Sequence, residues 1–271
     1  MKKIITLISI LYILGTPFVL NSQCNFKNTA FQEGEKLSYK VYYNWGLIWI
    51  NAGKVSFEVK SAILNDNNVF HFDSYGRSHT AYDWIFKVRD HYQSYAEIDS
   101  LRSLKFHRKT YEGGFEIDNS YIFNHRERRI YSSTQNSDQP HKKDSLDLPE
   151  CTFDLLTATY IIRNYDFSQY LKDEKIPISM VMDNEVHELY FRYRGKGVIQ
   201  TRKGESFICT KFTALLLEGS LFKGGEDLIV WVSDDDNRVP ILIEAKILVG
   251  SVKVYLDEAV GLRNEMRRKI E

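Results

Sequence analysis

Apolar and polar residues alternate with a period of two along most of this 271-residue chain. In residues 35–43, for example, Leu37, Tyr39, Val41 and Tyr43 fall on one face of an extended chain. This period is typical of a half-buried β-strand. Short polar turns separate many such segments, and helices long enough for a crossover between parallel strands are missing between them. The pattern therefore predicts antiparallel strands joined as a meander.

The expected elements place the chain in the mainly β class. So many strands must avoid open edges, as a closed barrel, as a half-barrel curled around a helix, or as a sandwich. We expect a large antiparallel meander sheet curled as a barrel or half-barrel, and the pattern leaves the sandwich open. Strands are predicted at residues 35–43, 47–50, 55–59, 69–75, 90–98, 104–111, 116–123, 129–133, 176–182, 185–193, 197–201, 207–217, 228–233, 239–247 and 251–259.

One main amphipathic helix is expected near the middle of the chain, over residues 152–164. Thr152 can cap its first turn. Phe153, Leu156 and Tyr160 recur at helical spacing, so they are expected to face the concave side of the sheet.

Three other segments carry local predictions. Residues 81–87 predict a short helix or an irregular turn. Residues 133–149 are polar and contain two prolines, which predicts a loop and a meeting point of two halves near residues 134–150. The pair Ala52-Gly53 predicts a close approach of two backbones, since a larger side chain would clash there.

The N-terminus reads as a secretory signal peptide. Two lysines precede an unbroken apolar run at residues 4–20, and polar residues follow it. This predicts a signal peptide over residues 1–22 and a single β-rich domain over 23–271, exported to the periplasm or associated with the outer membrane. The apolar run is at the low edge of a membrane span and no second one follows. No transmembrane domain is therefore expected after cleavage, and a retained anchor is the alternative.

The cysteines suit an oxidising compartment. Cys24 could carry a lipid anchor, but a lipidated Cys normally follows a small residue, and Gln23 is a poor one. Three cysteines leave at least one thiol unpaired. Cys209 lies in an alternating strand and is expected to be a buried free thiol. Cys24 and Cys151, at the edges of structured segments, are expected to form a disulfide.

Charge and motifs exclude several functions. Without the two lysines of the signal, 34 basic residues remain of the 36, against 36 acidic residues, which argues against a nucleic-acid partner. Zinc-helix spacings, phosphate loops and Gly-x-Ser-x-Gly elbows are absent from the sequence. No catalytic residue, metal or cofactor is therefore predicted.

Two polar clusters leave alternatives open. His71 and Asp73 share a strand face near His79, which suits a metal or acid–base site or simply a solvated strand face. The sequence DDDN at residues 234–237 resembles a calcium loop, but the Gly and the distant Glu of an EF-hand are missing. A polar hairpin turn is the favoured interpretation there.

An aromatic cluster supplies the candidate ligand-binding residues. Such a cluster can line an apolar cavity or stack on a sugar ring, and it can equally be ordinary cross-strand packing. The candidates are Tyr39, Tyr43, Trp45 and Trp49, with Tyr160 from the expected helix.

Four segments together resemble a known family. They are FQEGEKLSYKVYYNWG at residues 31–46 with NAGK at 51–54, CTFDLLTATYIIR at 151–163, WVSDDDNRVPI at 231–241 and GSVKVYL at 250–256. They are similar to the exported bacterial domain-of-unknown-function family 3108, and most similar to its Bacteroides-type members. The resemblance implies a periplasmic or outer-membrane location, and it strengthens the predicted Cys24–Cys151 disulfide. It implies no catalytic residue.

Two classes of function follow as hypotheses. The first is a cell-envelope binding or carrier protein, without catalysis, for an apolar or lipid-like ligand enclosed by the curled sheet. The alternative is an enzyme or accessory protein that acts on or binds polysaccharide. Its motivating carboxylates are Glu35, Asp73, Asp90 and Glu97. A purely structural role in envelope assembly, with a protein partner, is the third interpretation.

Overall fold

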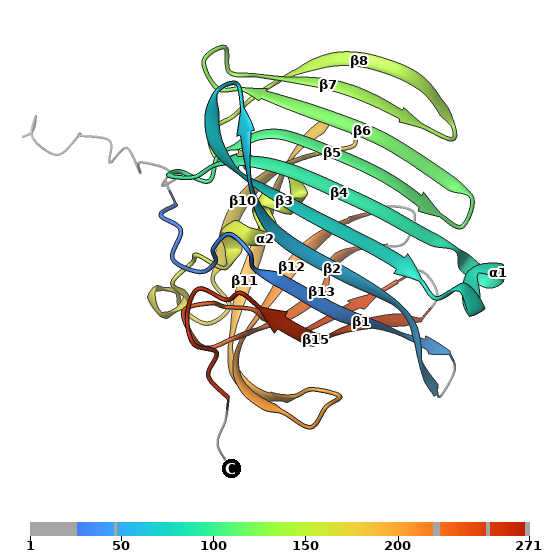
Figure 1. Ribbon diagram of the computed structural model, residues 1–271, viewed down its shortest axis with the longest axis vertical. Helices are drawn as coiled ribbons and strands as arrows, with labels where there is room; N and C mark the ends of the chain where they lie inside the picture. Colours follow the sequence, from blue (N-terminus) through green and yellow to red (C-terminus); the bar gives the residue numbers. More distant parts are fainter. Residues whose placement is uncertain (1–25, 46–47, 219–222, 248–249, 269–271) are drawn as a thin grey trace, which may run out of the picture.

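A single curled sheet makes up the molecule (Figure 1). The structure, a computed structural model, describes residues 26–268 apart from 46–47, 219–222 and 248–249. The predicted signal peptide and Cys24 lie outside this part of the chain. The fifteen strands run in the order β8-β7-β6-β5-β4-β3-β2-β1-β15-β14-β13-β12-β11-β10-β9. They are β1 (Lys36–Trp45), β2 (Ile48–Leu64), β3 (Asn67–Ser78), β4 (Val88–Glu97), β5 (Ser103–Glu112), β6 (Phe115–Asn124), β7 (Arg129–Asn136), β8 (Gln139–Asp147), β9 (Thr152–Phe153), β10 (Lys175–Met182), β11 (Glu185–Gln200), β12 (Ser206–Glu218), β13 (Lys223–Ser233), β14 (Pro240–Lys246) and β15 (Ser251–Val260).

Most neighbouring strands are also neighbours in the chain and pair antiparallel, as a meander does. Two pairs differ. β1 pairs with β15, which joins the first and last strands in the middle of the sheet, and the short β9 pairs in parallel with β10. The edge strands β8 and β9 do not pair with each other, so the sheet is a half-barrel that does not close. This confirms the mainly β antiparallel meander and selects the half-barrel among the alternatives.

Both open edges are protected. β9 has only 2 residues, and β8 carries the exposed residues Lys142 and Lys143. Very short edge strands and edge lysines oppose pairing with another chain. The prediction of a loop at residues 133–149 is wrong, because β7 and β8 form a hairpin there. The segment is polar because an edge strand buries little of its surface.

In the described residues, three short helical elements accompany the main helix. η2 (Thr80–Tyr82) and α1 (Asp83–Phe86) connect β3 to β4, as expected for residues 81–87, and η3 (Phe167–Gln169) follows the main helix. The main helix, α2, spans Leu155–Ile162 and is shorter than predicted.

The cap of α2 differs from the prediction. Asp154, not Thr152, is the capping residue, because its carboxylate accepts a hydrogen bond from the Thr157 amide at 2.8 Å. A carboxylate at this position satisfies a free amide and suits the positive end of the helix dipole. The residue expected to cap, Thr152, belongs to β9 instead.

Both ends of α2 are tied to other parts of the chain. The hydroxyls of Ser94 on β4 and Ser103 on β5 donate to the Asp154 carboxylate at 2.8 and 2.5 Å. Directly after the helix, Arg163 donates to the two carboxylate oxygens of Glu35 at 2.5 and 2.9 Å. The helix is therefore fixed to β4 and β5 at its start and to the entrance of β1 at its end.

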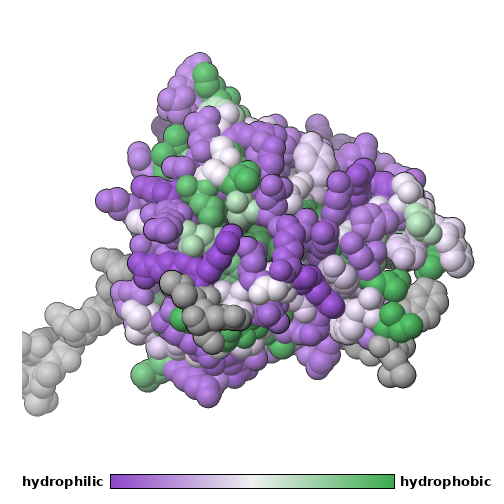
Figure 2. Space-filling view, turned by 60° about the horizontal axis from the view of Figure 1, so that its bottom comes forward, coloured by the Kyte–Doolittle hydropathy of each residue, from purple (hydrophilic) through white to green (hydrophobic). Residues whose placement is uncertain are grey.

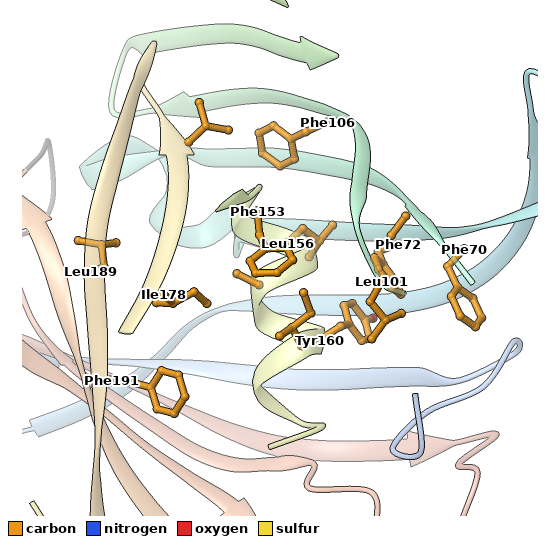
Figure 3. Packing of buried hydrophobic residues seen from close by; sticks show 14 of the residues in the cluster. Phe70, Phe72, Leu101, Phe106, Phe153, Leu156, Tyr160, Ile178, Leu189 and Phe191 are labelled. Carbon is orange, nitrogen blue, oxygen red and sulfur yellow. The ribbon is translucent and has the colours of Figure 1, made fainter. Parts of the chain in front are cut away.

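The inside of the half-barrel is a filled core. Phe153, Leu156 and Tyr160 are only 2%, 3% and 2% exposed, and they pack with side chains from both halves of the sheet (Figure 3). The Tyr160 ring stacks on Phe72 with centroids 4.0 Å apart. As predicted, these residues face the concave side of the sheet, and they fill the space around the helix.

The predicted close approach at Ala52-Gly53 is confirmed. A Cβ atom placed on Gly53 would lie 2.4 Å from the carbonyl oxygen of Arg77 on β3. Cys209 is buried and free, as predicted, and burial raises the pKa of its thiol to about 12. The Cys24–Cys151 disulfide stays a prediction, because Cys24 lies outside the described residues.

Candidate functional site

The aromatic residues predicted to bind a ligand do not form one site. Tyr39 and Tyr160 are both 2% exposed. The Tyr39 ring packs edge-on against Phe57, with centroids 5.8 Å apart. Tyr39 and Tyr160 therefore belong to the architecture of the protein.

The other three candidates lie where β1 and β2 begin to pair. Tyr43 pairs with Ile50 in the β1–β2 register, and the Lys253 ammonium lies 5.3 Å from the Trp49 ring. The side chain of Trp45 lies outside the described part of the molecule. Ile48 and Ile50, the strand partners of Trp45 and Tyr43, line a hollow that the sequence did not single out.

The cluster of His71, Asp73 and His79 is not a metal centre. The buried Asp73 carboxylate lies 2.6 Å from the Lys60 ammonium and 2.7 Å from a ring nitrogen of His91. Burial alone would raise the pKa of Asp73, but these two partners outweigh it and hold that pKa below its usual value. His79 instead lies 3.2 Å from the Asn51 side chain. Among the described residues, no group of three or more His, Cys, Asp or Glu could hold a metal ion.

The DDDN segment is a turn, as favoured. The Asp235 carboxylate accepts from the Ser233 hydroxyl at 2.9 Å and from the Asn237 amide at 3.0 Å. Asp234 pairs with Lys196 at 2.7 Å. These carboxylates thus stabilise the connection between β13 and β14, Asp235 within the turn and Asp234 through β11.

Large apolar side chains are exposed at one end of the half-barrel. We call this group the apolar tip. Green hydrophobic surface gathers at the right-hand end of Figure 2, the end at which Figure 1 shows α1. A hollow of about 320 Å³ lies between α1 and the start of β2, where Ile50 and Tyr82 are among its walls. The tip consists of Ile48, Trp84, Ile85 and Phe86, which are 66%, 81%, 42% and 42% exposed.

A second hollow crosses five strands. We call this hollow, of about 730 Å³, the trough. Each strand from β3 to β6 contributes three consecutive residues, and β7 contributes two together with Ser137, which directly follows it. The strand registers, and the hydrogen bonds between Ser137 and Glu116, align these residues into three rows. Successive side chains of a strand point to opposite faces, so two rows share one face. These outward rows are Tyr75, His91, Lys109, Asp118 and Gln135, and Arg77, Arg89, Tyr111, Glu116 and Ser137.

The floor of the trough is the backbone of the middle row. The side chains of this row point to the inner face, as Asp90 shows. Its Oδ1 atom is buried and has no hydrogen-bond partner among the described residues. Burial and, next, the nearby Glu112 raise the pKa of Asp90 to about 7. The trough is therefore an outer-face groove between two walls of side chains.

The apolar tip and the trough adjoin each other through α1. Asp83 of α1 pairs with Arg89 in the trough wall at 2.5 Å, and the Lys87 ammonium lies 4.9 Å from the Tyr111 ring. The Phe86 ring lies over the β5–β6 turn, where it occupies the space of a side chain at Gly113. The apolar and the polar hollow thus form one continuous surface.

Comparison with known proteins places the chain in a family. Residues 38–257 match the sequence profile described as "Protein of unknown function (DUF3108)". The chain belongs to this family. A crystal structure of a beta-barrel-like protein of domain of unknown function DUF1849 from Brucella abortus has a similar fold. Its TM-score is 0.53 at 10% identity, over 85% of this chain and 98% of that one. That likeness concerns the fold alone, and no curated protein matches the chain significantly.

Three of the DUF3108-like segments meet at one buried place. Glu35 comes from the first segment and Arg163 from the second, and their side chains are 0% and 2% exposed. The Arg163 guanidinium also donates to the carbonyl of Asn237, in the third segment, at 3.0 Å. Burial disfavours the charged guanidinium, but the Glu35 carboxylate outweighs this and holds the pKa of Arg163 above its usual value. The segments that carry the family resemblance therefore build the fold.

Sequence reasoning missed both hollows. The apolar triplet at residues 84–86 was visible within the segment predicted as a short helix, but its exposure was not. The trough has no local signal, because its walls come from five strands. Only the register of all five brings Tyr75 and Gln135 to the same row.

Proposed function

We propose that this DUF3108 protein is a non-catalytic binding protein of the cell envelope that engages lipid-like ligands through its apolar tip. The observation that carries the proposal is that the exposed side chains of Trp84 and Ile85 line one hollow together with Ile48, and that the exposed Phe86 follows them in α1. Contiguous exposed apolar side chains mark surfaces that bind membranes, ligands or other proteins. Export to the envelope is proposed from the N-terminal residues 1–22.

The energy of such contacts is sufficient for reversible binding. Full burial of one large apolar side chain contributes about 1.5–3 kcal/mol. Four side chains that are 42–81% exposed therefore offer on the order of several kcal/mol against acyl chains. Tryptophan also suits the boundary between acyl chains and headgroups, because its ring is amphipathic. No helix in the described part of the chain is long and apolar enough to cross a membrane.

The ligand is assigned to the rim rather than to the interior. The packing of α2 fills the concave side, as Phe153, Leu156 and Tyr160 show. A lipid enclosed by the sheet, as the sequence suggested, would have to displace this core. Contact at the tip requires no such displacement.

The trough favours glycan binding over glycan hydrolysis. Glu116 and Asp118 lie two residues apart on β6, so both side chains are on the outer face of the sheet, where a glycosidase would need a pair of carboxyl groups. Both are exposed, however. A general acid at neutral pH needs a desolvated carboxyl. Of the four carboxylates named from the sequence, Glu35, Asp73 and Glu97 are held in ion pairs. The fourth, Asp90, is desolvated, but its side chain points to the inner face of the sheet and not into the trough.

Vesicle co-sedimentation tests the proposal. The mature protein is expected to pellet with phosphatidylcholine vesicles, and Trp84→Ala with Ile85→Ser is expected to lose this binding. The matched control is Ile63→Ser with Leu171→Ala, because these side chains are 74% and 79% exposed outside the tip. Equal loss in both double variants, or no binding by the wild type, would contradict lipid binding at the tip. Intact mass of the exported protein tests cleavage after residue 22.

A further inference from the structure

We propose that the ligand is an anionic glycolipid, with its charged saccharide in the trough and its acyl chains at the apolar tip. This inference rests on the proposed lipid binding and names the class of lipid. It is motivated by the contact between the two hollows, since one amphipathic molecule can occupy both only if they adjoin. Asp83, Lys87 and Phe86, which bridge them, lie within one short connection.

The charge of the trough favours an anionic group over β3–β5. Arg77 and Lys109 are exposed, and neither has a carboxylate partner in the described part of the chain. Arg89, the other guanidinium in the trough, is already paired with Asp83 at 2.5 Å, and a ring nitrogen of His91 lies 2.7 Å from the Asp73 carboxylate. A sulfate, phosphate or carboxylate group would give Arg77 and Lys109 the charge-assisted hydrogen bonds that they lack.

The shape and the aromatic rings of the trough favour a saccharide. The trough crosses five strands, about 19 Å at the usual strand spacing, which suits an extended chain of several linked rings. Tyr75 stacks on His91 with centroids 4.0 Å apart and remains 51% exposed, so it presents ring surface to a ligand. Farther along, Glu116 and Gln135 offer acceptors and donors for hydroxyl groups.

A solvated polar strand face would contain similar residue types, but it would lack two of these features. The hollow of about 730 Å³ has walls on both sides. It also runs directly into the exposed Trp84 and Phe86 at α1. A groove that contains two cations without carboxylate partners, Arg77 and Lys109, and that continues into an apolar end points to one amphipathic ligand.

The experiment compares vesicles that differ only in one lipid. Phosphatidylcholine vesicles carry a minor fraction of sulfated galactosylceramide, of neutral galactosylceramide or of phosphatidylglycerol. The wild type is expected to bind the sulfated glycolipid at least about tenfold more tightly than either other lipid, the effect of one or more charge-assisted hydrogen bonds. Arg77→Ala with Lys109→Ala is expected to remove this preference while binding to plain vesicles and the unfolding midpoint stay unchanged.

A matched control uses cations outside the trough. Arg126→Ala with Lys143→Ala removes two exposed charges from the same half of the sheet, and the preference is expected to persist. Equal binding of phosphatidylglycerol, or a preference that survives in Arg77→Ala with Lys109→Ala, overturns the saccharide site. So does an equal loss in the control variant.

Calorimetry with a soluble sulfated galactose oligosaccharide separates this inference from the proposed function. One outcome is that the protein binds no vesicle, whereas the oligosaccharide binds the wild type but not the double variant Arg77→Ala with Lys109→Ala. Lipid binding at the tip is then wrong. The glycolipid is then overturned, and only the saccharide site stands. If vesicles bind through Trp84 but the oligosaccharide and the sulfated glycolipid show no preference for the trough, this inference is wrong and the proposed function stands.

Discussion

The two α-helices of this protein differ in how they are held. α2 lies in the core, with Asp154 tied to the sheet at its start and Arg163 paired with Glu35 at its end. α1 is a single turn at the rim, attached through Asp83, and it exposes Trp84 to solvent. We therefore infer that the buried helix stabilises the fold and that the exposed helix offers a contact surface. The family match at residues 38–257 covers both helices, and the proposed activity concerns the exposed one.

The contrast between the two helices predicts its largest effect at the buried ion pair of Glu35 and Arg163. Glu35→Ala is expected to lower the free energy of unfolding by about 3–5 kcal/mol, because it leaves the Arg163 charge buried and unpaired. Urea denaturation measures this loss. Glu97→Ala is the control, because it breaks the partly exposed pair with Arg102 and should cost about 1 kcal/mol or less. Equal losses would mean that the buried pair does not hold α2 in place.

A core leucine on α2 gives the next largest effect. Leu156→Ala is expected to cost about 2–5 kcal/mol, since a large-to-small change leaves a cavity. Leu171→Ala, at a residue 79% exposed, should change the free energy of unfolding by less than about 0.5 kcal/mol. Chemical denaturation of both variants decides, and a negligible loss at Leu156 would make α2 a loose cover instead of a core element.

The third largest effect is expected at the close backbone contact between β2 and β3. Gly53→Val is expected to cost more than about 2 kcal/mol, because the added Cβ would overlap the Arg77 carbonyl oxygen. Gly76→Ala is the control, because a Cβ there would have no neighbour closer than 3.6 Å. Thermal melts compare the two. A loss of about 1 kcal/mol or less for Gly53→Val would be the ordinary surface range and would refute close packing.

The Asp90 carboxyl, whose buried Oδ1 atom has no hydrogen-bond partner among the described residues, should respond to pH. The pKa of Asp90 is raised to about 7 from 3.8, so between these values the folded protein holds a proton that the unfolded chain releases. Stability contributed by this group is therefore present at low pH and is lost as pH rises to 7. Asp90→Asn should gain about 1–3 kcal/mol on the wild type by pH 8. A difference between the two proteins that does not change from pH 4 to 8 would exclude this titration.

The smallest expected effect is at the tip. Trp84→Ala should change the free energy of unfolding by less than about 0.5 kcal/mol, because its side chain is 81% exposed. Denaturation and vesicle binding are measured on the same sample. A large loss of stability would mean that Trp84 holds the rim together, and the contrast between α1 and α2 would then disappear.

Local pattern predicts the fold of this chain better than its site. The alternation at residues such as Leu37 and Tyr39 predicts strands, and short turns predict the meander. The choice of a half-barrel depends on how β8 and β9 protect their edges, which is a property of the whole sheet. The hairpin at β7 and β8 was missed because edge strands do not need an apolar face.

The candidate site could not be predicted from the sequence, for related reasons. Exposure distinguishes Trp84 from a core residue such as Phe153, yet both stand in short apolar segments. The trough depends on registers that accumulate from β3 to β7, and a slip of one residue in any pair would turn Lys109 or Arg77 to the inner face. The partners of the buried Glu35–Arg163 pair are 128 residues apart in the chain, so spacing could not connect them.

The pairing of β1 with β15 has a consequence for the order of folding. Most other strand pairs form within one hairpin, but this seam joins residue 36 to residue 260. Closing so long a loop costs chain entropy before any contact compensates for it. The seam is therefore expected to form last, after both halves of the sheet have grown as local hairpins. The backbones of Gly34 and Gly261 already touch, since a Cβ on Gly261 would lie 2.3 Å from the Gly34 carbonyl oxygen. The segments before Gly34 and after Gly261 also lie together, because Arg263 and Asn264 donate to the carbonyls of Asn28 and Thr29. A circular permutant that joins these two segments through a linker would bring both sides of the seam close together in the chain, and it should fold faster than the natural chain.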